Sequence, residues 1–82
     1  MGKTQITQRY FKEVLRSYRL ASGLSQEKAS ELMGISRSYY SLFEIGKRYP
    51  TVDMFIHMAN VLQVNPGEML NTLIAAAKKA KK

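Results

Sequence analysis

Cysteine and tryptophan are absent from this 82-residue chain, and it contains one histidine, His57. Without cysteine, neither a disulfide framework nor a thiolate metal site can form. His57 has no second histidine with which to share a metal, so we expect a surface or partly packed side chain and neither a metal nor another cofactor. The lack of disulfides suits a reducing cytoplasm, where we expect the protein to act.

Long apolar runs and catalytic residue sets are also missing. No run approaches the roughly 20 apolar residues that span a bilayer. The first residues, MGKTQITQRYF, lack the apolar core of a secretion signal. There is no nucleophile paired with a base, no phosphate-cradling glycine loop and no set of metal ligands. We therefore expect neither a membrane protein nor an enzyme.

The amino acids that are present suffice for one small domain. A hydrophobic fraction of 45% is enough for a compact helical core, and from 82 residues we expect no separate effector domain. We interpret residues 1–82 as a single domain that ends in a lysine-rich tail at residues 78–82.

The net charge of +7 comes from 13 basic and 6 acidic residues. Four of the basic residues lie in the tail, and the other nine leave the body of the chain at +3. The tail is either an arm that binds phosphates or a solvated helix end, where lysine is favoured by the helix dipole. The basic excess makes nucleic acid a candidate partner.

Apolar spacing and helix-capping residues predict five helices and no strand. The first is expected over residues 7–21, because Phe11, Val14, Leu15 and Tyr18 fall on one helical face. Three more are expected at residues 26–33, 37–45 and 52–62, the last of them after Thr51 as its cap. The fifth is expected to start at Pro66, after Asn65 as its cap; residues 75–82 either extend it or fray.

The fourth and fifth helices carry more apolar residues than a small core needs. The apolar face of the fourth is predicted to comprise Val52, Phe55, Ile56, Ala59 and Leu62, and that of the fifth Met69, Leu70, Leu73 and Ile74. Met54 and Met58 lie off the first of these faces. We expect them, with Leu73, to contribute an exposed apolar surface for a partner.

The stretch from Leu24 to Pro50 has the outline of a helix-turn-helix. Ser25 and Ser36 each stand one residue before a helical run, where a hydroxyl can accept from a free backbone N–H. Gly34 falls where the chain must turn sharply between the two runs. In such a unit the second helix lies in the major groove of DNA.

The same stretch contains a longer series of residues at characteristic spacing: Gly23-Leu24-Ser25-Gln26, Ala29, Gly34-Ile35-Ser36, Glu44, Gly46-Lys47 and Pro50. With this series the chain resembles the phage repressor/Cro-like (XRE-like) helix-turn-helix DNA-binding family. The match runs from about Val14 to about Leu70, roughly two thirds of the chain. The resemblance implies an all-α, compact five-helix domain of the lambda-repressor type that binds double-stranded DNA.

Phosphate contacts are expected at helix and loop ends. The resemblance implies that Gln26, at the start of the second helix, contacts a phosphate, and Ser25 precedes it in the same turn. It also implies that the basic loop containing Lys47, Arg48 and Tyr49 lies along the DNA backbone. The alternatives are a simple polar helix start for Gln26 and simple solvation for the loop.

Base contacts are expected from the outward face of the third helix. The candidates are Arg37, Ser38, Tyr39, Ser41 and Leu42. Arg37 is the strongest, because its guanidinium can bind the O6 and N7 of guanine together. The alternative for Arg37 is a phosphate contact or a solvated side chain. Leu42 departs from the polar residue common in the family; it meets a thymine methyl or packs beside Phe43. Tyr40 takes the place of an aliphatic core residue, so we expect it in the core.

Arg19 and Glu44 stand 25 residues apart but match family positions that form a partly buried ion pair. Such a pair would neutralise a carboxylate close to DNA and lock the third helix to the body of the domain.

The function expected is a sequence-specific transcriptional regulator, a repressor that binds an inverted-repeat operator as a homodimer through the fourth and fifth helices. The alternative is an antitoxin-like interaction module that binds a partner protein as well as DNA.

Overall fold

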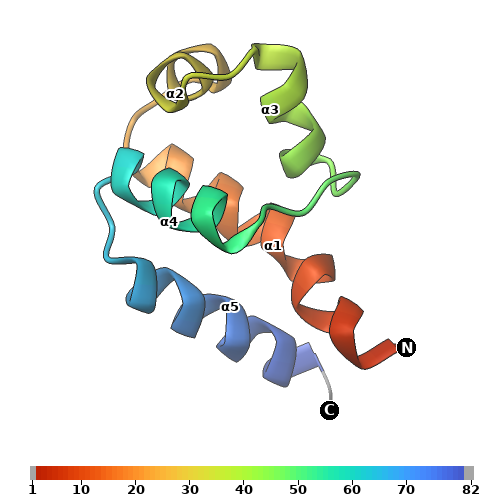
Figure 1. Cartoon of the computed structure of the whole chain (residues 1–82). Helices are drawn as coiled ribbons and strands as arrows, with labels where there is room; N and C mark the ends of the chain where they lie inside the picture. Colours follow the sequence, from red (N-terminus) through yellow and green to blue (C-terminus); the bar gives the residue numbers. More distant parts are fainter. Residues whose placement is uncertain (1, 81–82) are drawn as a thin grey trace.

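The computed structural model describes residues 2–80 and consists of five helices joined by short turns. They are α1 (Gly2–Ala21), α2 (Gln26–Met33), α3 (Arg37–Glu44), α4 (Val52–Val61) and α5 (Pro66–Ala80). In Figure 1, α2 and α3 lie together at one end, α1 and α4 form the middle, and α5 lies on the opposite side. The predicted all-α, five-helix architecture is confirmed.

The predicted capping residues define where the helices begin. The Ser25 hydroxyl accepts from Lys28 N at 3.0 Å, and the Ser36 hydroxyl accepts from Tyr39 N at 3.1 Å. Thr51 and Asn65 cap α4 and α5 in the same way. Because each cap satisfies a backbone donor that the helix itself leaves unpaired, it fixes the first turn independently of the core.

The glycines that follow α2 and α3 have left-handed backbone conformations. Gly34 has φ 78° after α2, and Gly46 has φ 85° after α3. At Gly46 an added Cβ would also lie 3.1 Å from Lys12 Cδ, so the side chain of Lys12 crosses the glycine. A larger residue at position 46 would therefore face both backbone strain and a close contact.

Some predicted helix ends differ from the structure. α1 begins at Gly2 rather than near Thr7, and Ile45 follows α3 as its cap rather than belonging to it. α5 extends through the lysine-rich stretch to Ala80, with Lys78 and Lys79 in its last turn. Lys81 and Lys82, the rest of the predicted tail, lie outside the described residues.

All five helices contribute side chains to the core, α2 through Ala29 and Met33. Its largest fully buried side chains are Phe11, Leu15, Tyr40, Phe43, Met58, Met69 and Leu73. Tyr18 adds a polar link from α1 to α5, because its hydroxyl lies 2.8 Å from Thr72 Oγ1. The prediction that Tyr40 belongs to the core is correct.

The predicted apolar face of α4 is partly wrong. Met58 is 0% exposed and belongs to the core, whereas Val52 and Ile56 are 75% and 41% exposed. The buried face runs through Phe55, Met58, Ala59 and Leu62. Leu73 of α5 is also fully buried, so neither Met58 nor Leu73 can contribute the exposed partner surface that was predicted.

Two negative observations apply to residues 2–80. None of the helices is long and apolar enough to cross a membrane. Within the same residues, no group of three or more His, Cys, Asp or Glu side chains is placed to hold a metal ion. The one histidine, His57, lies with Nε2 3.0 Å from the backbone carbonyl of Met33.

Candidate nucleic-acid interface

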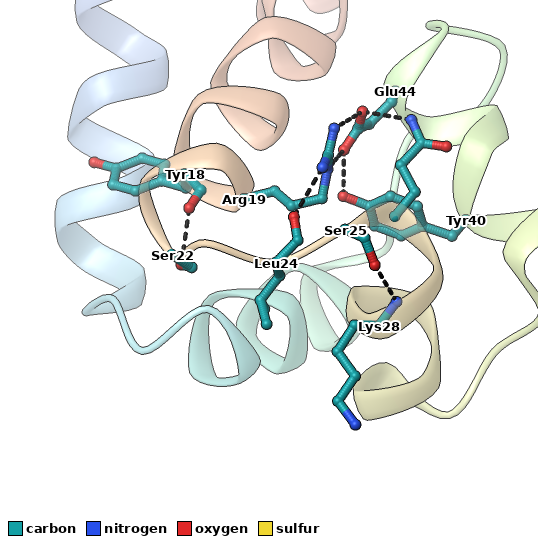
Figure 2. A network of polar contacts seen from close by, with 9 residues as sticks. Tyr18, Arg19, Ser22, Leu24, Ser25, Lys28, Tyr40 and Glu44 are labelled. Atoms are coloured by element: carbon teal, nitrogen blue, oxygen red, sulfur yellow. Dashed lines mark hydrogen bonds and ion pairs between the residues drawn. The ribbon is translucent and has the colours of Figure 1, made fainter.

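A buried ion pair fastens α3 to α1. Arg19 Nε donates to Glu44 Oε2 at 2.6 Å, and Nη2 donates to Oε1 at 3.2 Å. Their side chains are 9% and 3% exposed. Arg19 also donates from Nη1 to the carbonyl of Leu24, at the turn before α2 (Figure 2). The two residues predicted to pair therefore meet, and the arginine reaches the helix-turn-helix as well.

Glu44 also accepts hydrogen bonds from side chains of α2 and α3. Gln26 Nε2 donates to Glu44 Oε1 at 2.9 Å, and the Tyr40 hydroxyl donates to Oε2. We call Arg19, Gln26, Tyr40 and Glu44 the polar hub; Figure 2 shows the convergence of Arg19 and Tyr40 on the carboxylate. Because donors on three helices share one carboxylate, the hub fixes α1, α2 and α3 relative to one another.

The hub keeps Glu44 ionised although it is buried. Burial works to raise the pKa of Glu44, but hydrogen bonds from Arg19, Tyr40 and Gln26 outweigh it and the pKa is lowered. The bond to Glu44 in turn raises the pKa of Arg19. Burial, with a contribution from Glu44, raises the pKa of Tyr40 well above its ordinary value. The charges that lock α3 therefore persist around neutral pH.

The hub was only partly predictable. Sequence reasoning identified Arg19 and Glu44, but it placed Tyr40 in the core for packing and gave Gln26 a phosphate contact or a simple polar helix start. Tyr40 and Glu44 are four residues apart on one helix, a spacing that brings side chains together and was an available signal. No local signal joins Gln26 to Glu44, since they lie 18 residues apart.

The predicted phosphate contacts at α2 are near this hub. Gln26 is half-buried and uses one N–H of its amide on Glu44, which leaves the second N–H and the carbonyl oxygen for other partners. The Ser25 oxygen accepts from Lys28 N, and its own hydroxyl proton remains available as a donor. Both residues stand at the N-terminus of α2, where the helix dipole favours an anion.

On α3, the first turn is open to solvent. Arg37 and Ser38 are both exposed, directly after the Ser36 cap. Ser41 is half-buried, and its hydroxyl donates to the carbonyl of Ser38 at 3.0 Å, so its donor is used within the helix. The structure thus presents Arg37 and Ser38 most freely among the predicted base-reading residues.

Leu42 and Tyr39 lie on the flanks of α3 and are half-buried. Leu42 is outside the core cluster and outside the set of partly buried apolar residues packed on it, so contact with a thymine methyl stays a prediction. Tyr39 packs edge-to-face on Phe43, with ring centroids 5.3 Å apart.

The loop after α3 carries the remaining predicted contacts. Lys47 and Arg48 are exposed, and Tyr49 packs its ring edge-to-face on Phe11 with centroids 5.4 Å apart. Backbone donors of Lys47 and Arg48 both bond the carbonyl of Leu42, which holds the loop against the end of α3. The basic loop and the exposed face of α3 are therefore contiguous in the chain and tied together.

In this arrangement, a tight turn joins two helices, and the second helix is exposed along its outer side. A comparison with known families agrees with it. A family model described as helix-turn-helix matches residues 15–69. The chain belongs to this helix-turn-helix family. The predicted membership of the XRE-like group is confirmed, and the matched span covers α2, α3 and α4 together with the C-terminal end of α1 and the start of α5.

Curated relatives within the family come from Bacillus subtilis (strain 168). One is the SPbeta prophage-derived uncharacterized HTH-type transcriptional regulator YonR, 33% identical over 60 residues, which are 73% of this chain and 56% of the relative. Another is the uncharacterized HTH-type transcriptional regulator YqaE, 33% identical over 55 residues, 67% of this chain and 47% of the relative. The chain thus spans about half the length of these relatives.

Solved helix-turn-helix structures are similar too. The restriction-modification controller protein C.AhdI from Aeromonas hydrophila is 33% identical, with a TM-score of 0.68 over 80% of this chain and 97% of its own. The clp gene regulator ClgR from Corynebacterium glutamicum has a TM-score of 0.84 over 92% of this chain and 80% of its own. At 17% identity, ClgR supports the fold alone.

Proposed function

We propose that this helix-turn-helix protein is a sequence-specific DNA-binding transcriptional regulator, a repressor that binds an inverted-repeat operator as a homodimer. The observation that carries the proposal is the exposed first turn of α3, with Arg37 and Ser38, held by a buried hub and followed by a basic loop. A rigid helix can present exposed hydrogen-bond donors to base edges while the basic loop contacts phosphates.

The proposed division of work follows from the side chains. Arg37 can bind guanine O6 and N7 together, which is the commonest specific contact in the major groove. Lys47, Arg48 and the start of α2 supply phosphate contacts that fix the register of α3. A protein of this kind represses transcription simply by occupying a promoter, because polymerase and regulator compete for the same DNA.

The homodimer is proposed to form through α4 and α5. With Met58 and Leu73 assigned to the core, the exposed large apolar residues on these helices are Val52, Ile56, Leu70 and Ile74, at 75%, 41%, 44% and 39% exposure. Leu70 and Ile74 are four residues apart and lie on one side of α5. A twofold dimer would bury this surface and place two copies of α3 in successive turns of the groove.

Selection of bound sequences from random duplexes tests the DNA-binding proposal. We expect enrichment of an inverted repeat with half-sites about one helical turn, roughly 10 base pairs, apart. Recovery of unenriched duplexes would contradict sequence-specific binding. Recovery of a single half-site would contradict the homodimer.

Sedimentation of purified protein tests assembly. The monomer has a mass of 9.3 kDa, and we expect a species of twice that mass at micromolar concentration. Leu70→Glu with Ile74→Glu should yield the monomer, because two carboxylates cannot be buried in an apolar interface. Leu20→Glu is the matched control: Leu20 is also exposed, at 57%, but lies on α1. A monomer in all three proteins would contradict the homodimer.

A further inference from the structure

Arg48 is held against the flank of α3 by Tyr39. Its guanidinium carbon lies 5.2 Å from the centroid of the Tyr39 ring, and its Nε donates to the Tyr39 hydroxyl at 3.3 Å. The Tyr39 ring packs in turn on Phe43, which is 1% exposed. A continuous series of contacts therefore runs from the core, through Tyr39, to a charged side chain in the loop.

These two contacts constrain a side chain that would otherwise be mobile. An arginine on an exposed loop has several rotatable bonds, and immobilising them on binding lowers affinity. Stacking on Tyr39 and the bond from Nε reduce that freedom before DNA arrives. Since Nε is occupied by the tyrosine, the N–H groups on Nη1 and Nη2 remain to bind the oxygens of a phosphate.

The Tyr39 hydroxyl can serve the same ligand. It accepts from Arg48 Nε, so its own proton is free to be donated. A phosphate placed beside α3 would then receive N–H donors from Arg48 and an O–H donor from Tyr39. Both groups carry no information about base identity, because every nucleotide has the same phosphate.

We propose that Tyr39 is a positioning residue that holds Arg48 ready to bind a backbone phosphate beside α3, an inference that rests on the proposed function. Tyr39 then acts through Arg48 and does not read a base, in contrast to the role predicted from the sequence. The assignment makes Arg48 part of a preformed phosphate site, whereas Lys47 is an exposed charge on the same loop.

The contact itself can be tested without DNA, by NMR of the arginine side chains. Protons of the Arg48 side chain should be shifted upfield by the Tyr39 ring in the wild-type protein. Tyr39→Phe keeps the ring and should keep that shift, but should speed solvent exchange of the Arg48 Nε proton. Tyr39→Leu keeps an apolar contact for Phe43 and should abolish the shift. An Arg48 spectrum that is the same in all three proteins would overturn the proposal.

Binding measurements on a selected site and on a random duplex test the consequence. Tyr39→Leu should weaken both complexes equally, by about two- to fivefold, the range of an exposed cation–π contact. In an Arg48→Ala background the same substitution should have a smaller effect, limited to the bond that the Tyr39 hydroxyl donates to the phosphate. In a Lys47→Ala background, the matched control, it should retain its full effect. Thermal melts of each variant ensure that only folded protein is compared.

Two results would overturn the proposal while leaving the proposed function intact. One is a changed base preference in Tyr39→Leu, which would make Tyr39 a base-reading residue. The other is an undiminished effect of Tyr39→Leu in the Arg48→Ala background, which would mean that Tyr39 acts independently of Arg48. Wild-type protein that binds no duplex would instead contradict the proposed function itself.

Discussion

The two sides of α3 differ in how their polar groups are held. On the inner side, Glu44 is 3% exposed and accepts hydrogen bonds from Arg19, Gln26 and Tyr40. On the outer side, Arg37 and Ser38 are exposed to solvent. The inner polar groups are hydrogen-bonded within the protein, whereas the outer polar groups remain available to a ligand.

The difference shows how one short helix can be held rigidly on its inner side and still present free polar groups on its outer side. α3 has eight residues, too few for a stable helix in isolation. Its position therefore depends on the core and on the polar hub, so substitutions there should act on stability first. Substitutions on the outer side should act on binding and leave stability unchanged.

The largest effect is expected from Glu44→Ala. Removal of the carboxylate leaves the buried Arg19 without a partner, which should lower the free energy of unfolding by about 3–5 kcal/mol. Chemical denaturation measures this loss. Glu31→Ala is the control, because its ion pair with Lys28 spans 3.6 Å between exposed side chains and contributes little. Equal losses in the two variants would contradict the role of the hub.

Next in size is Arg37→Ala, on the outer side. It should cost about 1–3 kcal/mol of binding free energy on the operator and much less on random DNA. The free energy of unfolding should not change, since Arg37 is exposed. Titrations on both duplexes measure the difference, with Arg16→Ala as an exposed control on α1. A loss of stability like that of Glu44→Ala would remove the distinction between the two sides.

Lys47→Ala should weaken binding evenly on all sequences. Loss of one phosphate contact lowers the slope of log affinity against log salt by roughly one unit. Titrations over a range of salt concentrations measure the slope. Lys79→Ala, in the last turn of α5, is the comparison. A similar fall in that variant would show that the lysine-rich stretch also binds phosphate, whereas altered base preference in Lys47→Ala would contradict its assignment.

The smallest effect is expected on acidification. The pKa of Glu44 in the folded protein lies below its ordinary value of 4.5. Its ionisation therefore stabilises the fold fully above pH 4.5, and that contribution is lost as the pH falls through the folded-state pKa. Unfolding measured between pH 3 and 7 should show a shallower acid-side loss in Glu44→Gln than in wild type. If the free energy of unfolding fell equally with decreasing pH in the two proteins, other carboxylates would dominate acid unfolding.

Local signals predicted the fold well, for a physical reason. The starts of α2, α3, α4 and α5 coincide with their predicted capping residues, because a cap acts on the backbone within three residues. It was harder to predict which face of α4 is buried. Val52, Ile56 and Met58 are all apolar, and only the packing of α4 against its neighbours decides that Met58 is buried.

The candidate site was predictable at the level of positions but not of contacts. The helical pattern placed Arg37 on the outward face of α3, and the family resemblance placed Lys47 and Arg48 in the loop that follows it. Neither could show that Arg48 folds back on Tyr39 or that Gln26 bonds Glu44, because these contacts depend on side-chain conformations set by the tertiary structure.

The claim that the outer side of α3 reads DNA is tested most directly by measuring base preference at each operator position for wild type and Arg37→Ala. Competition with operators that carry single base-pair changes gives this profile. We predict that Arg37→Ala loses the preference for guanine at one position in each half-site and keeps the others. An unchanged profile would contradict base reading by Arg37 and move it to other residues of α3.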